Sequence, residues 1–201
     1  MDNKNIISLL TLFFIVLIWS AINPHDYFTW FLEVLPAIIG LLILIFTYNK
    51  FKITQLVYFL ITLHSIILII GGHYTYAEVP LGQWMKETFN FSRNHYDRIG
   101  HFAQGFIPAL IIREVVIRKN IINGRRWQFV FIVSMCLAIS ALYEFFEWWV
   151  AIGTGTASDA FLGTQGDVWD TQWDMFFAFV GSIASLVFLS KIHDKFIKNL
   201  N

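Results

Sequence analysis

Residues capable of chemistry gather in three short stretches of this chain. The first, HYDRIGHF at 95–102, places Asp97 and His101 four residues apart, so they share one face of a helix. A carboxylate in that position can orient an imidazole, or both groups can bind one cation. The alternative is that Asp97 caps the helix while His101 forms a hydrogen bond between helices.

The second stretch, YEFFEWW at 143–149, carries Glu144 and Glu147, three residues apart on one helix face. Paired carboxylates can hold a metal ion, or can divide the roles of acid and base between them. We therefore interpret both glutamates as candidate catalytic residues. The alternative is that each pairs with Arg93 or Arg98, or that Glu147 reaches the interface that the neighbouring tryptophans mark.

The third stretch, GDVWDTQWDM at 166–175, places Asp167, Asp170 and Asp174 at spacings of three and four residues. Asp167 and Asp170 suit the N-terminus of a helix, where the macrodipole favours anions. Asp174 lies about one turn further along and needs a partner if it is buried in a membrane. A bound cation or the facing Arg98 would provide one.

A mixed set of histidine and carboxylate ligands suits Zn, Mn or Fe, whereas a set of carboxylates alone suits Mg or Ca. We expect the candidate cofactor to be one divalent ion, Zn, Mn, Fe or Mg. Its candidate ligands are Asp97, His101, Asp170, Asp174 and His73. No established zinc signature such as H-E-x-x-H is present.

Other polar residues in the apolar segments are weaker candidates. Glu33 lies near the same end of its segment as the three stretches. His64 falls near the middle of a segment, where a lone histidine usually forms a hydrogen bond between helices. His25 and His193 are expected to be solvated.

The composition is that of a membrane protein. The chain has 201 residues, of which 57% are hydrophobic and only 14% charged, whereas soluble domains contain about 25% charged residues. The net charge of zero argues against a nucleic-acid partner. A single cysteine, Cys136, excludes an intrachain disulfide and a cysteine-rich metal site.

Six apolar segments are long enough to cross a bilayer, for which about 20 residues are needed. They cover residues 5–23, 28–48, 54–73, 99–117, 127–151 and 171–191. We expect one all-α polytopic domain over residues 1–201, with the first segment retained rather than cleaved as a signal peptide. The third loop, 74–98, predicts a short interfacial helix, and the loop 152–170 should be structured over the helix mouths.

The distribution of Lys and Arg predicts the orientation. With the N-terminus inside, the outer segments hold only Lys86, Arg93 and Arg98, so eleven of the fourteen basic residues lie on the inner side. Positive charge accumulates on the cytoplasmic side of membrane proteins. Both termini are therefore expected in the cytoplasm, and the three stretches at the outer face.

Four segments carry a resemblance to a known family. They are GGHYTYAEVPLG at 71–82, HYDRIGHFAQG at 95–105, YEFFEWW at 143–149 and LGTQGDVWDTQWDM at 162–175. With these segments the chain resembles the YjdF-like proteins, an uncharacterised family of the bacterial inner membrane. The resemblance implies a multi-pass inner-membrane protein and no particular activity.

A looser likeness connects the chain to VanZ-like proteins. It rests on Asp97-Arg98 before His101-Phe102, then Glu144, then the aspartates that open the last segment. Arg98 replaces the lysine usual in those proteins, and the asparagine that often follows their aspartate is absent. The likeness suggests work on the cell envelope at the outer leaflet.

Three functions compete at this stage. The first is a metal-dependent hydrolase or transferase that acts on a lipid-linked or envelope substrate, with one glutamate as general base. The second is a non-catalytic membrane protein held together by buried ion pairs around Arg93 and Arg98. The third is a small transporter, which the apolar inner half of the segments disfavours because His64 is the polar residue noted there.

Overall fold

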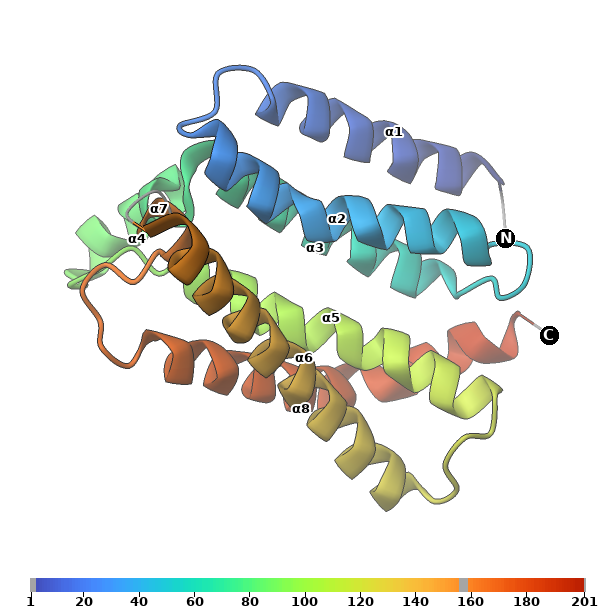
Figure 1. The fold of residues 1–201 in the computed structure, drawn as a ribbon. Coiled ribbons are helices and arrows are strands. Elements are labelled where there is room, and N and C mark those ends of the chain that lie inside the picture. Colours follow the sequence, from blue (N-terminus) through green and yellow to red (C-terminus); the bar gives the residue numbers. More distant parts are fainter. Residues whose placement is uncertain (1–2, 156–158, 201) are drawn as a thin grey trace.

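The chain folds as a bundle of long helices, seen here in a computed structural model that describes residues 3–155 and 159–200 (Figure 1). Within those residues every regular element is helical. The long helices are α1 (Asn3–Ser20), α2 (Tyr27–Thr47), α3 (Gln55–Tyr74), α5 (Tyr96–Arg118), α6 (Arg125–Thr154) and α8 (Asp170–Lys198). The short ones are η1 (Tyr76–Glu78), α4 (Pro80–Phe89) and α7 (Asp159–Leu162).

Five of these helices are long and apolar enough to cross a membrane, namely α2, α3, α5, α6 and α8. This confirms the predicted polytopic all-α fold. Helix α1 is also apolar but has only 18 residues, which is close to the lower limit of about 17 for a span. The sixth crossing therefore stays a prediction.

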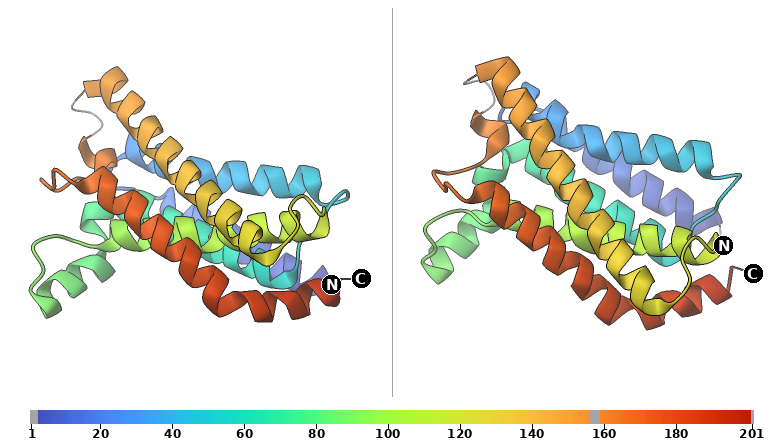
Figure 2. Two further views of the ribbon diagram at one scale, coloured as in Figure 1. Left: turned by 90° about the horizontal axis from the view of Figure 1, so that it is seen from below. Right: turned by 60° about the horizontal axis from the view of Figure 1, so that its bottom comes forward.

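The helices run lengthwise between two ends of the molecule. Helices α4 and α7 and the long loops gather at one end, and both termini lie at the other (Figures 1 and 2). Helices α1, α2 and α3 form one side of the bundle, while α5, α6 and α8 form the other, with α6 inclined across its neighbours. The three stretches of chemically capable residues consequently meet at the end that holds α4 and α7. We call this end the outer end and the opposite end the inner end, after the orientation that the sequence predicts.

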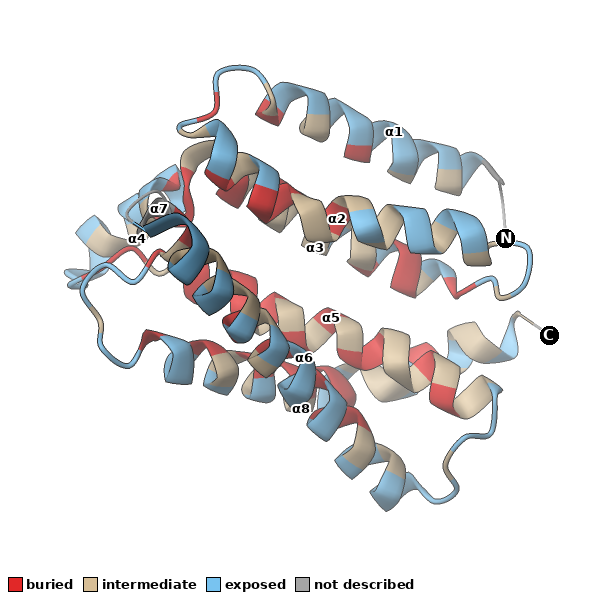
Figure 3. Ribbon diagram, viewed as in Figure 1, coloured by how far each residue is buried: buried red, intermediate tan, exposed pale blue. Residues whose placement is uncertain are grey.

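Helix α5 is the most deeply buried of the five spans and packs against α3, α6 and α8 (Figure 3). Its closest neighbour is α8, because glycines face backbone at their contact. A β-carbon on Gly105 would overlap the carbonyl oxygen of Ala178, and one on Gly181 would overlap that of Phe102. Small residues of this kind let helix backbones approach closely in membranes.

The loop between α3 and α5 contains the predicted short helix, α4. Pro80 occupies the first turn of α4, and Asn90 ends that helix in the left-handed conformation with φ of 55°. Trp84 and Phe89 are exposed on α4, which suits a helix lying on a membrane surface. In the loop 152–170, the described helix α7 packs on α2, α6 and η1, and its Phe161 is buried.

Fusions of a reporter enzyme should test the topology. Fusions after residue 48 and at the C-terminus should report as cytoplasmic, and one after residue 88 as external, because eleven of the fourteen Lys and Arg residues favour this orientation. An external C-terminus would refute six crossings with both termini in the cytoplasm. If the other two signals are reversed as well, either α1 does not cross or the whole bundle has the opposite orientation.

Substituting the glycines should test the α5–α8 contact. Gly105→Ala should destabilise the protein by roughly 1–3 kcal/mol or more, because the added carbon has to displace backbone of α8. Gly40→Ala on α2 is the matched control, since its β-carbon would meet nothing within 4 Å. That change should leave the thermal midpoint in detergent unchanged or raised, because alanine favours helix. Equal effects at both positions would contradict close packing.

Candidate metal-binding pocket at the outer face

Two buried arginines organise the outer ends of α5 and α8. Arg98 donates to Asp174 Oδ1, to Asp170 Oδ1 at 2.6 Å and to Asp167 Oδ2 at 3.2 Å. Arg93 donates to Asp170 Oδ1 at 2.5 Å and to the Gly163 carbonyl at 3.2 Å.

Asp97 completes this arginine cluster, which consists of Arg93, Arg98, Asp97, Asp167, Asp170 and Asp174. Its Oδ2 lies 3.5 Å from Arg93 Nη2 and 3.6 Å from Arg98 Nη1. Both arginines are nearly inaccessible to solvent, with exposures of 6% and 5%. Two arginines thus face four aspartates. These contacts link the stretch at 166–175 to the stretch at 95–102.

His101 lies beside the arginine cluster and joins three helices. Its Nε2 is 3.3 Å from Asp97 Oδ1 on α5 and 3.6 Å from Asp174 Oδ1 on α8. Its Nδ1 is 3.0 Å from Gln104 Oε1 and 3.9 Å from Glu144 Oε1 on α6. The structure therefore brings together His101, Glu144 and Asp174, as the cost of unpaired polar groups in hydrocarbon predicts.

The glutamates of α6 lie away from the arginines. Glu144 is buried, and its Oε1 has no hydrogen-bond partner among the described residues. The ion pairs of the described residues include none between Glu144 or Glu147 and an arginine. The alternative that each glutamate pairs with Arg93 or Arg98 is therefore wrong, since the aspartates occupy both guanidinium groups.

A cavity of about 190 Å³ extends inward from His101. It is lined by side chains of α2, α3, η1, α5, α6 and α7, including Glu33, His64, Tyr76, Asp97, His101, Gln104, Tyr143, Glu147 and Phe161. His64 Nε2 is buried there without a hydrogen-bond partner. The predicted hydrogen bond of this histidine to another helix is absent at that nitrogen, which leaves it free to meet a ligand.

Tyr76 contributes a hydroxyl group to this outer pocket from η1, where the chain turns away from α3. Burial, reinforced by the nearby Glu33 carboxylate, raises the pKa of the Tyr76 phenol well above its usual range. Tyr76 consequently stays protonated and keeps its hydrogen-bond donor at neutral pH. Gly71 and Gly100 make room for its ring, because a β-carbon at either position would overlap it.

Among the residues that the structure describes, two overlapping groups of side chains could hold a metal ion. One consists of Asp97, His101 and Asp174, and the other of His101, Glu144 and Glu147. In each group the possible ligand atoms lie within 4.8 Å of one another. Asp174 and Asp97 already contact arginines, whereas the ion pairs of the described residues give neither glutamate of the second group an arginine partner.

Two of the predicted metal ligands lie elsewhere. Asp170 lies inside the arginine cluster, between Arg93 and Arg98. His73 is outside the pocket, because its Nδ1 lies 3.0 Å from the Ser20 carbonyl oxygen and its ring packs on Trp19. His73 thus ties the end of α3 to α1.

A second buried polar network lies at the inner end of the bundle, and the spacing of its residues is only a weak signal in the sequence. Glu114 accepts hydrogen bonds from Thr54 N at 2.8 Å, Arg118 at 2.7 Å and Thr54 Oγ1 at 2.7 Å. Glu114 Oε2 also lies 3.0 Å from His193 Nε2, and Arg113 lies 3.1 Å from the other nitrogen of that ring.

The expectation that His193 is solvated is wrong, because this residue is fully buried. Helix α8 continues to Lys198, seven residues beyond the predicted end, so His193 still faces α5. The one available signal was the spacing of Glu114 and Arg118, which are four residues apart on α5.

Comparisons with known proteins agree with this architecture. A multi-pass helical protein with a polar outer end is the class that the fold defines. The chain belongs to the family described as "Predicted membrane protein (DUF2238)", which matches residues 6–195. It is 47% identical over 179 residues to the inner membrane protein YjdF of Escherichia coli (strain K12), covering 89% of this chain and 86% of that protein.

No solved structure matches the chain. The resemblance to YjdF-like proteins is thus confirmed, together with a location in the inner membrane. The looser likeness to VanZ-like proteins stays a prediction.

Replacing Arg98 should be among the most damaging single changes at this end. Arg98→Gln should cost roughly 3–5 kcal/mol of stability, because it leaves buried Asp170 and Asp174 without their counter-charge. Arg98→Gln combined with Asp174→Asn should recover part of the loss. Arg126→Gln, an exposed arginine on α6, is the control. Thermal unfolding in detergent would measure all three, and an Arg98→Gln midpoint equal to the control would contradict the ion-pair account.

Proposed function

We propose that the outer pocket binds one divalent cation through His101, Glu144 and Glu147, and that the protein is a metal-dependent hydrolase or transferase. Its substrate would be a lipid-linked or envelope molecule that enters from the outer leaflet. The observation that carries the proposal is the pair of carboxyl groups beside His101 that no arginine contacts. Glu144 and Glu147 share a largely dry site with no arginine, and one Glu144 oxygen has no partner.

The donor chemistry of the pocket fits such an ion. One imidazole and two carboxylates suit Zn, Mn or Fe. Mg would need further carboxylate or water ligands. The Nδ1 atom of His101 faces Glu144 and the Gln104 side chain, while its Nε2 atom faces Asp97 and Asp174. An ion bound at Nδ1 would replace the contact with Gln104. A carboxylate on the far side of a histidine ring orients that ring and fixes its tautomer. Asp97 and Asp174 are thus better placed to orient His101 than to hold the ion, because Arg98 would repel a cation there.

Chemical roles for the other pocket residues follow from their positions. A divalent ion in this pocket would polarise a substrate oxygen or activate a water molecule. A glutamate oxygen not used for the ion can accept a proton from that water, which is the role of a general base. The Tyr76 hydroxyl can donate to a substrate oxygen. The inner part of the cavity is lined by Leu68, Pro108 and Ile139, which suits the apolar part of a lipid-linked substrate.

A non-catalytic role is the second candidate, and the arginine cluster favours it. The six side chains of the arginine cluster come from α5, α8 and the loops that precede these two helices, and they link these elements without any ligand. Transport has weaker support. Glu114 and His193 add polar groups to the inner half, but their partners saturate them and the buried Ile107 and Leu110 lie on α5 between the two networks.

Metal analysis should test the proposed site. The purified protein should contain about one divalent ion per chain. Chelation should lower its thermal midpoint by roughly 5–10 °C, because an ion at a hundred times its Kd contributes about 2.7 kcal/mol. The double variant with His101→Ala and Glu144→Gln should lose both the ion and the response to chelator.

The matched control changes a histidine and a glutamate that face each other on the outer surface. His25 Nε2 lies 3.3 Å from Glu78 Oε2, and both side chains are about half exposed, at 49% and 60%. His25→Ala with Glu78→Gln should keep the ion.

A separate experiment tests the reaction. The metal-loaded protein should change the headgroups of a bacterial inner-membrane lipid extract, as detected by mass spectrometry, and the Glu147→Gln variant should not. Metal-free protein with an unchanged midpoint in chelator would overturn the ion, and bound metal without turnover would favour the non-catalytic role.

A further inference from the structure

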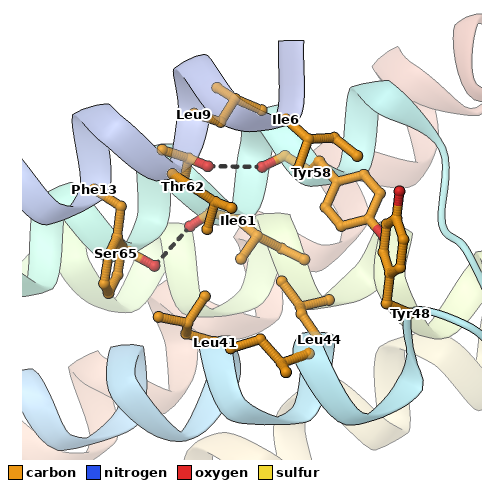
Figure 4. Close-up of a pocket in the computed structure, with 12 residues that line it drawn as sticks. Ile6, Leu9, Phe13, Leu41, Leu44, Tyr48, Tyr58, Ile61, Thr62 and Ser65 are labelled. Carbon is orange, nitrogen blue, oxygen red and sulfur yellow. Dashed lines mark hydrogen bonds between the residues drawn. The ribbon is translucent and has the colours of Figure 1, made fainter. Parts of the chain in front are cut away.

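A second, larger cavity lies at the opposite end of the bundle, where the termini are. It is a groove of about 320 Å³ between α1 and α2, floored by α3 (Figure 4). Ile6, Leu9 and Phe13 border it from α1, and Leu41, Leu44 and Tyr48 from α2. From Ile6 to Phe13 the groove follows α1 for about 10 Å, given a rise of 1.5 Å per residue. Its volume falls in the range of ligand pockets, roughly 300–1,000 Å³.

The groove is apolar although its floor carries hydroxyl groups. Thr62 donates to the Tyr58 carbonyl at 3.0 Å and Ser65 donates to the Ile61 carbonyl at 2.9 Å, both within α3 (Figure 4). With these donors satisfied by backbone, the groove presents hydrocarbon to its contents. Leu10 and Ile45, which also line it, are 37% and 57% exposed. The groove is therefore open sideways, toward the space that lipid fills around a membrane protein.

Three lysines lie in or beside the loop between α2 and α3, at one end of this groove. The Lys52 ammonium lies 4.7 Å from the centroid of the Tyr48 ring, which lines the groove. Lys50 is exposed in the same loop, and the Lys119 ammonium lies 5.4 Å from the Phe51 ring. Residues 34–77, which include this loop, contain no Asp or Glu, and Glu114 is occupied by Arg118, Thr54 and His193. The ion pairs of the described residues include none with Lys50, Lys52 or Lys119, so the charge of these lysines is available to an anion.

We propose that this groove binds one anionic phospholipid, with an acyl chain between α1 and α2 and the phosphate against Lys50, Lys52 and Lys119. An apolar slot beside three lysines matches the two parts of such a lipid, since the chain gains apolar contact and the headgroup gains charge. Basic residues next to a membrane attract anionic lipid headgroups in this way. The site is separate from the outer pocket, and its occupancy does not depend on a metal there.

Native mass spectrometry of delipidated full-length protein in detergent can test this site. Dioleoylphosphatidylglycerol should bind at least tenfold more tightly than dioleoylphosphatidylcholine, which has the same chains, because each lysine near a headgroup adds attraction. The variant with Lys50→Gln, Lys52→Gln and Lys119→Gln should lose this preference. Leu41→Trp, which fills the groove, should weaken binding of both lipids, with Leu44→Trp as the second filler if the first does not fold.

The control variant carries Arg125→Gln and Arg126→Gln, two exposed arginines at the start of α6. It should bind dioleoylphosphatidylglycerol as the wild type does. Glycerol 3-phosphate, a headgroup without chains, should not compete. Equal binding of the two lipids to the wild type would overturn the proposal, as would a preference that survives the lysine changes or undiminished binding in folded groove-filling variants.

Discussion

The cost of removing charge from water shapes this protein more than any other constraint. Arg93 and Arg98 are almost completely buried at the outer end of the bundle, and a single unpaired ion there would cost several kcal/mol. Four aspartates from α5, α8 and the preceding loop meet that cost. Because these groups come from distant parts of the sequence, satisfying the arginines fixes α8 against α5. At that distance between α5 and α8, Gly105 and Gly181 contact the backbone of the opposite helix, and a residue with a β-carbon would not fit at either position.

That arrangement divides the acidic residues into two classes. The four aspartates of the cluster form ion pairs with the arginines. Glu144, Glu147 and Glu33 line or adjoin the cavity without an arginine partner. His101 lies at the boundary, with one ring nitrogen toward each class. A structural network and a ligand site therefore adjoin each other, and the first orients the histidine of the second. Carboxyl groups outnumber arginines at this end of the bundle, and those that no arginine contacts include Glu144 and Glu147 on α6.

Much of the fold could be predicted from the sequence, because the membrane imposes length and polarity on each span. The five long helices begin and end within a few residues of the predicted segments, except for the end of α8. The pairing of Asp97 with His101 followed from helix periodicity alone. The partners of the arginines could not be assigned, since Asp and Glu have equal charge and only the rotation of α6 and α8 decides which faces Arg98. Glu114 and His193 were missed for a related reason, because basic neighbours suggested a solvated inner surface.

The inner network shows why buried charge by itself does not define a site. Glu114 and His193 are both fully buried, yet each oxygen of the carboxylate has two partners and both ring nitrogens are engaged. Such a saturated network has no free coordination or hydrogen-bonding capacity, so its consequence is to join α3, α5 and α8. The outer pocket differs in having buried atoms without partners on Glu144 and His64. Unsatisfied atoms beside a cavity are costly in a native protein, and a ligand that pairs with them removes that cost. The difference between these two ends therefore locates the candidate chemistry at the outer face.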